Sequence, residues 1–96
     1  MRDSSDLIRH YNTYGSGHYF SKDTMRFFKS RVLSDIYMVK EGLYLFITSE
    51  AMIDGTRAYT IRQYEVSSTA IETIGEFMQY ETRAKAMAGV RRLLRG

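Results

Sequence analysis

The chain has no cysteine, no proline and no tryptophan among its 96 residues. The missing cysteines exclude a disulfide framework, a thiolate zinc site and a cysteine nucleophile, and they fit a reducing compartment. Because proline is absent, no peptide bond in the chain lacks the N–H that donates in a helix or a sheet. We therefore expect a fold that depends on its hydrophobic core and its backbone hydrogen bonds.

Long apolar segments are also missing. The longest apolar run, residues 43–47, is far shorter than the roughly 20 residues of a membrane-spanning helix. Residues 1–14 are polar and of mixed charge, and they lack the apolar stretch of a signal peptide. We expect a soluble, cytoplasmic protein that makes no contact with a membrane.

Aromatic and basic side chains are plentiful. The chain carries eight tyrosines and five phenylalanines, and its 14 basic and 11 acidic residues leave a net charge of +3. A hydrophobic content of 44% is typical of a globular chain, and this length suits one domain. We predict an N-terminal arm or irregular segment over residues 1–20 and a single α+β domain over residues 21–96.

The first clear helix signal begins at Ser21, a residue type that caps helix N-termini. Met25, Phe28 and Val32 follow at spacings of three and four residues, which places them on one apolar helical face. We expect this helix to end near residues 31–33.

Strand signals follow over residues 35–40, 43–50, 58–66 and 70–74. Glu41-Gly42 and Asp54-Gly55 are typical of the turns between such strands. Residues 43–47 are apolar at every position, so the alternation does not say which side faces the core. A last helix is expected after Thr82, with one apolar face made by Ala86, Met87, Val90, Leu93 and Leu94.

This order of elements predicts an α+β fold. Its core is a three- to four-stranded antiparallel meander sheet with two helices packed on one face. The other face of the sheet would then be open and rich in tyrosine, threonine and arginine.

Four segments of the chain resemble one family of small proteins. They are residues 17–32 (GHYFSKDTMRFFKSRV), 46–50 (FITSE), 57–62 (RAYTIR) and 71–77 (IETIGEF). The first resembles the signature YFS-x-DTMRFF-x-SR of proteins encoded by phages and mobile elements, whose activity is uncharacterised. The resemblance implies such a source. Small phage proteins often bind and block a host machine, and anti-CRISPR proteins are one class of them.

Arg26, Phe27 and Arg31 are the first candidate partner-binding residues. Phe27 projects away from the predicted apolar face, so it either reaches the sheet edge or is an exposed anchor. Aromatic and arginine side chains concentrate the binding energy of interfaces. Alternatively, the basic residues only solvate the helix.

Arg57, Arg62 and Tyr64 are the second group, on the third predicted strand. On an open sheet face such side chains stack against unpaired bases. In the alternative, a helix covers this face and Arg62 pairs with a carboxylate of Glu50, Glu65 or Glu72.

Arg91, Arg92 and Arg95 form the third group, near the end of the last helix. They would contact phosphates or an acidic groove of a host protein. A solvated helix end, where positive charge matches the helix dipole, explains the same residues.

The sequence thus predicts a non-catalytic protein without metal or cofactor. His10 and His18 are eight residues apart and lack the spacing of a metal or catalytic motif. We hypothesise that the chain binds and inhibits a nucleic-acid-handling defence complex in the host cytoplasm, with a host protein or ribonucleoprotein as its partner. The alternative is direct binding of RNA or single-stranded DNA. A homodimer through an exposed strand edge is a further hypothesis.

Overall fold

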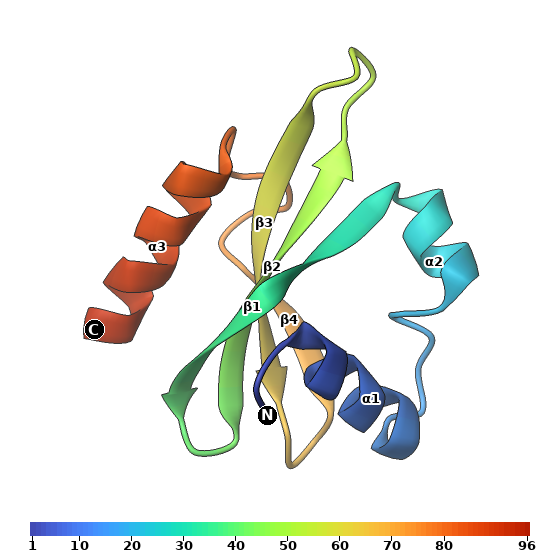
Figure 1. Cartoon of the computed structure of the whole chain (residues 1–96), viewed down its shortest axis with the longest axis vertical. Helices are drawn as coiled ribbons and strands as arrows, with labels where there is room; N and C mark the ends of the chain where they lie inside the picture. The colour runs from blue at the N-terminus through green and yellow to red at the C-terminus, as the bar shows by residue number, and fades with distance from the viewer.

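Figure 1 shows the computed structural model, which describes all 96 residues as a twisted sheet with three helices. The elements are α1 (Ser4–Tyr14), α2 (Lys22–Phe27), β1 (Ser30–Lys40), β2 (Leu43–Ala51), β3 (Arg57–Glu65), β4 (Ala70–Ile74) and α3 (Arg83–Arg95). The four strands lie in chain order, and each pairs antiparallel with the next. The α+β class and the antiparallel meander are confirmed.

Both predicted hairpin turns are present, and each contains a glycine with a positive φ angle. Gly42 has a φ of 80° between β1 and β2, and Gly55 has a φ of 87° between β2 and β3. Glycine adopts this backbone conformation without the steric cost that a Cβ atom brings. These two glycines therefore determine where the chain reverses.

The central strand β2 supplies two cores, because successive side chains of a strand point to opposite faces of the sheet. On one face, Leu45 and Ile47 pack with Ile61 and with Ala86 and Val90 of α3. On the opposite face, Phe46 packs with Tyr64 of β3 and with the helix α1. We call these the α3 face and the α1 face.

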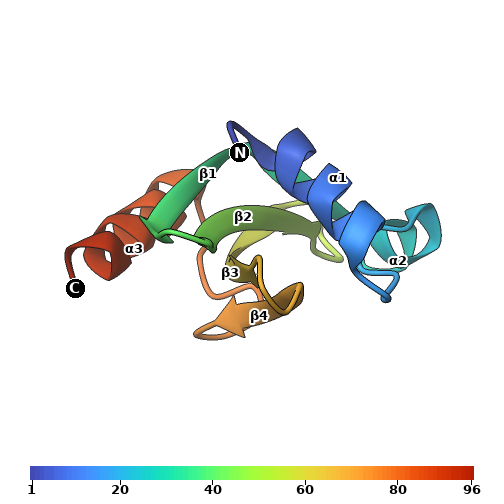
Figure 2. The ribbon, with the colours of Figure 1, turned by 90° about the horizontal axis from the view of Figure 1, so that it is seen from below.

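The two long helices therefore cover opposite faces of the sheet, as Figure 2 shows. The prediction that one face of the sheet stays open is wrong, because α1, a helix that was not predicted, covers it. The cause is the run of apolar residues at 43–47, which presents hydrophobic side chains to both faces. Each face then needs its own cover to exclude water.

The N-terminal segment contains a helix where an arm or irregular segment was expected over residues 1–20. Asp3 caps α1 by accepting a hydrogen bond from the backbone N–H of Asp6. Leu7 and Tyr11 of α1 are buried against Phe46 and Tyr64. Residues 1–14 thus contribute to the hydrophobic core through Leu7 and Tyr11.

The helix α2 is shorter than predicted. Ser21 caps it as expected, and its side chain accepts a hydrogen bond from the Thr24 N–H. The helix ends at Phe27, and Lys29 has a φ of 49°. Residues 30–32 instead pair with β2, because strand pairing satisfies their backbone groups and removes apolar side chains from water.

The last helix begins as predicted, since the Thr82 hydroxyl accepts from the Lys85 N–H. Only part of its expected apolar face is used. Ala86 and Val90 are buried, whereas Leu93 and Leu94 remain exposed near the end of the chain. None of the three helices is long and apolar enough to cross a membrane.

Candidate functional site

The predicted binding residues do not form one surface. Arg57, Arg62 and Tyr64 are built into the sheet, whereas Arg26, Phe27 and Arg31 are exposed on α2 and at the start of β1. The remaining group, Arg91, Arg92 and Arg95, is exposed on α3, far from α2 in Figure 1.

Tyr64 cannot meet a partner, because its side chain is completely buried on the α1 face. Its hydroxyl lies 2.6 Å from Nδ1 of His10, which α1 brings across the sheet. Burial raises the pKa of Tyr64, and the nearby Tyr11 adds to the shift. This residue joins α1 to β3 and is part of the core.

Arg57 also has a structural role. Its Nε donates to the Ser49 hydroxyl at 2.9 Å, and its Nη2 donates to the backbone carbonyls of Ser49 and Lys29 at 2.7 and 3.0 Å. The bond to Lys29 ties the chain between α2 and β1 to the sheet. Arg57 therefore holds the α2 segment in place.

Arg62 is paired, and its partner is Glu50, one of the three carboxylates considered from the sequence. The Nη2 of Arg62 donates to Oε1 of Glu50 at 3.0 Å, while its Nε donates to Thr48 at 3.2 Å and its Nη1 to Thr73. The side chain of Arg62 is 11% exposed and that of Glu50 is 1% exposed. The predicted open face with a free Arg62 is thus absent.

Two aromatic rings flank the guanidinium of Arg62. Its Cζ lies 5.3 Å from the ring centre of Phe77 and 5.9 Å from that of Tyr19. Both distances are within the range of cation–π attraction. Phe77 follows β4 and Tyr19 precedes α2, so two remote loops meet over one side chain of β3.

Three phenylalanines form an exposed cluster next to this arginine. Phe27 and Phe28 meet edge to face with centres 4.9 Å apart, and Phe28 and Phe77 do so at 6.4 Å. All three side chains are exposed, and Phe27 is the most exposed at 77%. We call Phe27, Phe28 and Phe77 the aromatic patch.

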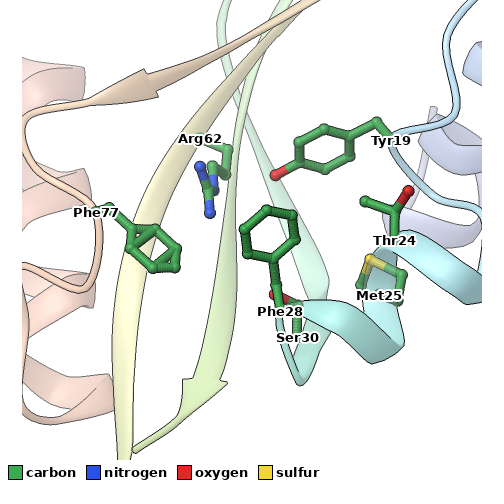
Figure 3. A pocket seen from close by; sticks show the side chains of 7 residues that line it. All are labelled: Tyr19, Thr24, Met25, Phe28, Ser30, Arg62 and Phe77. Atoms are coloured by element: carbon green, nitrogen blue, oxygen red, sulfur yellow. The ribbon is translucent and has the colours of Figure 1, made fainter.

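A cleft of about 180 Å³ opens beside the patch. Figure 3 shows side chains from α2, β1, β3 and the two loops arranged around it. They are those of Tyr19, Thr24, Met25, Phe28, Ser30, Arg62 and Phe77. Burial raises the pKa of Tyr19, and the Arg62 charge opposes the shift while Glu50 adds to it.

The segment of residues 22–31, which contributes Met25, Phe28 and Ser30 to the cleft, is strongly basic. Residues 22–31 carry four basic side chains and one acidic one, a net charge of +3 that equals the charge of the whole chain. The basic residues, all exposed, are Lys22, Arg26, Lys29 and Arg31. This surface combines apolar rings with positive charge.

Sequence reasoning found Phe27 but missed Phe77 and Tyr19 as members of the site. Their positions in the sequence carry no periodic signal, because both lie in loops. Phe28 was assigned to the core of a longer helix, and the early end of α2 leaves it exposed instead.

Groups that would support metal chemistry do not gather in this chain. No cluster of three or more histidine, cysteine, aspartate or glutamate side chains is arranged to hold a metal ion. His10 is engaged with Tyr64, and His18 is exposed in the loop before α2. The lining of the cleft offers apolar rings and the N–H donors of Arg62.

One protein-family model matches almost the whole length of the fold. A family of unknown function, DUF7447, matches residues 5–91, from α1 into α3. The chain belongs to this family. The DUF7447 match thus confirms that the chain is a member of an uncharacterised family and covers every residue of the cleft. No curated protein and no solved structure matches the chain.

Proposed function

We propose that this protein is a non-catalytic binding module that docks on a protein partner through the aromatic patch. The contact of Phe28 with Phe77, a residue about 50 positions later in the chain, carries the proposal, because it joins Phe77 to the exposed Phe27–Phe28 pair. Exposed large apolar side chains that gather in one place are typical of interaction sites, because water contact with them is unfavourable. A partner that covers the rings removes this cost.

The partner surface is acidic in this proposal. The patch lies against the basic segment of residues 22–31, and complementary charge steers two proteins together and sets their orientation. Arg26 is the charged neighbour that we expect to contact it, whereas Arg31 lies opposite Ser49 in the register and so points to the α3 face. Phe27 is the anchor, because interfaces concentrate their energy in a few aromatic and arginine side chains.

The class of partner that we propose is chosen on the resemblance of residues 17–32 to proteins of phages and mobile elements. We propose a host complex that handles nucleic acid in defence, as for anti-CRISPR proteins, in the host cytoplasm. Docking would block nucleic-acid entry or a conformational step of that complex. The support is the family resemblance of residues 17–32 together with the two exposed rings, Phe27 and Phe28, that this same segment contributes to the patch.

Affinity capture from a host lysate with matched variants tests the proposal. Phe27→Ser removes the anchor, and Ile53→Ser replaces another apolar residue, even more exposed, in the β2–β3 hairpin away from the patch. We expect Phe27→Ser to weaken capture of a specific partner at least about tenfold, whereas Ile53→Ser leaves it unchanged. Equal capture by both variants would overturn the proposal.

A second pair of variants tests the charge. Arg26→Glu reverses a charge beside the patch, and Arg92→Glu reverses one on the distant α3. We expect only Arg26→Glu to slow association, with the difference between the two variants shrinking as salt is added. If Arg92→Glu has the larger effect, the partner docks on α3 and the patch is not the interface.

Direct binding of RNA or single-stranded DNA is the competing outcome. Arg62 and Tyr64 are not available for base stacking, so phosphate contacts would have to come from the exposed arginines of α2 and α3. Such binding falls steeply as salt rises, because counterions are released. Tight oligonucleotide binding that Arg92→Glu weakens and Phe27→Ser does not would favour it over the proposal.

A further inference from the structure

We propose that the cleft beside Arg62 is the seat of one phenyl-sized apolar side chain of the partner, within an acidic segment whose carboxylate binds Arg62. This inference rests on the proposed function, because the cleft and the aromatic patch share Phe28 and Phe77. Beyond the proposed function, the inference specifies the kind of side chain that the partner must insert.

The size of the cleft indicates which side chain of the partner it can hold. Its volume is about 180 Å³, and an apolar cavity of about 150 Å³ accommodates a benzene ring. Its apolar walls are Met25, Phe28, Phe77 and the ring of Tyr19. Ring edges and faces of this kind pack favourably against another aromatic ring. A single phenyl ring therefore fits, whereas an alanine methyl group would leave most of the space empty.

The N–H donors that Arg62 does not use within the chain indicate which chemical group lies next to the bound ring. A guanidinium has five N–H groups, and Arg62 donates one each to Glu50, Thr48 and Thr73. One N–H on each terminal nitrogen is left without an acceptor in the chain. Two donors on neighbouring nitrogens match the two oxygens of a carboxylate.

The position of Arg62 is already determined before a ligand arrives. Its three hydrogen bonds and its two flanking rings hold the guanidinium still, so binding costs little side-chain entropy. Because Glu50 already balances one charge on Arg62, the positive field that attracts an acidic ligand comes mainly from residues 22–31. The ligand must therefore be acidic over several residues.

Three peptides and the isotope-labelled full chain test this inference by amide chemical shifts. The probes are acetyl-EEFEE-amide, acetyl-EEAEE-amide and acetyl-QQFQQ-amide. We expect saturable shifts with EEFEE at about 1 mM peptide, at Arg62 Nε–H and at the amides around the cleft. The alanine and glutamine peptides, which lack the ring or the charges, should bind at least about tenfold more weakly.

Variants of the cleft wall complete the test. Phe77→Ala should abolish EEFEE binding, and Met25→Ala provides a second wall variant should the first perturb the fold. Ile53→Ala is the matched control and should bind as the unmodified chain does. Phe27 anchors the chain on its partner but does not line the cleft. The Phe27→Ser variant should therefore bind the EEFEE peptide with an affinity within about threefold of that of the unmodified chain.

The results separate this inference from the proposed function. No saturable shift with EEFEE, equal binding of EEAEE, or shifts confined to α3 would overturn it. If EEFEE fails while partner capture still depends on Phe27, the patch remains the interface and only the cleft assignment is lost. If EEFEE binds while Phe27→Ser captures its partner normally, the cleft stands and the proposed function fails.

Discussion

Arg62 on β3 donates a 3.0 Å hydrogen bond to Oε1 of Glu50 on β2, and the Glu50 side chain is only 1% exposed. Thr48 and Thr60 donate to the same oxygen, at 2.8 and 3.3 Å. The second oxygen, Oε2, is buried and has no hydrogen-bond partner. The pair thus lies almost wholly out of water, where the loss of either charge leaves the other uncompensated.

The first prediction concerns this ion pair. Arg62→Ala should lower the free energy of unfolding by about 3–5 kcal/mol, because it leaves the buried Glu50 carboxylate without a counter-charge. Denaturant titration measures the change. Lys85→Ala is the control, since it breaks an exposed pair with Glu81 and should change the stability little. Similar stability of the two variants would show that water reaches Glu50.

The second prediction concerns α1. Leu7 is completely buried in a cluster with Phe46 and Tyr64, so Leu7→Ala should cost about 2–5 kcal/mol of unfolding free energy. Asn12→Ala, at an exposed position of the same helix, should have little effect. Thermal and denaturant unfolding measure both variants. If Leu7→Ala leaves the stability unchanged, residues 1–14 contribute nothing to the core.

The third prediction is a loss of stability in alkali. Burial raises the pKa of Tyr19, Tyr37 and Tyr64 above the ordinary value of 10.0. The folded state therefore holds these protons more tightly than the unfolded chain does. Their stabilising contribution is complete below a pH of about 10 and is lost as the pH rises through the raised values.

Unfolding measured at several alkaline pH values, together with the ultraviolet absorbance of tyrosinate, tests this prediction. The folded protein should form tyrosinate at higher pH than the denatured chain does. Tyr37→Phe should make the fall in stability shallower, because it removes one of the three groups. Coincident tyrosinate curves for the folded and denatured protein would contradict the prediction.

The fourth prediction concerns Gly89, which lies on the buried side of α3. A Cβ atom at this position would come within 2.6 Å of the Tyr80 hydroxyl and 3.0 Å of Ile61 Cδ1. Gly89→Ala should therefore destabilise the protein by about 1–3 kcal/mol, although alanine favours helices more than glycine does. Denaturant unfolding gives the sign of the change, and added stability would show that α3 moves away freely.

Local chemistry was readable in the sequence wherever a few neighbouring residues decide the structure. The hydroxyls of Ser21 and Thr82 cap helices as predicted, because a cap needs only the next three residues. The turn glycines Gly42 and Gly55 and the span of residues 70–74 were predicted on similar grounds. The position of Phe27 off the apolar face left two alternatives, the sheet edge or an exposed anchor, and the structure shows the side chain exposed.

Long-range packing decided the rest. A helix as short as α1 is marginal alone in water, and it is stabilised here by contact with Phe46 and Tyr64. The end of α2 depends on β2, whose backbone pairs with residues 30–32. The sequence offered three carboxylates for Arg62, and the sheet register selected Glu50.

By itself, the sequence determined the α+β class, the order of the strands and the places where the chain turns, because these depend on nearby residues. Only the tertiary structure decided that both faces of the sheet are covered. It also brought Phe77 beside Phe28 and turned Arg62 and Tyr64 from expected binding residues into buried ones. Burying apolar area on both sides of β2 is favourable. The local sequence pattern does not indicate which distant segment will pack on each side.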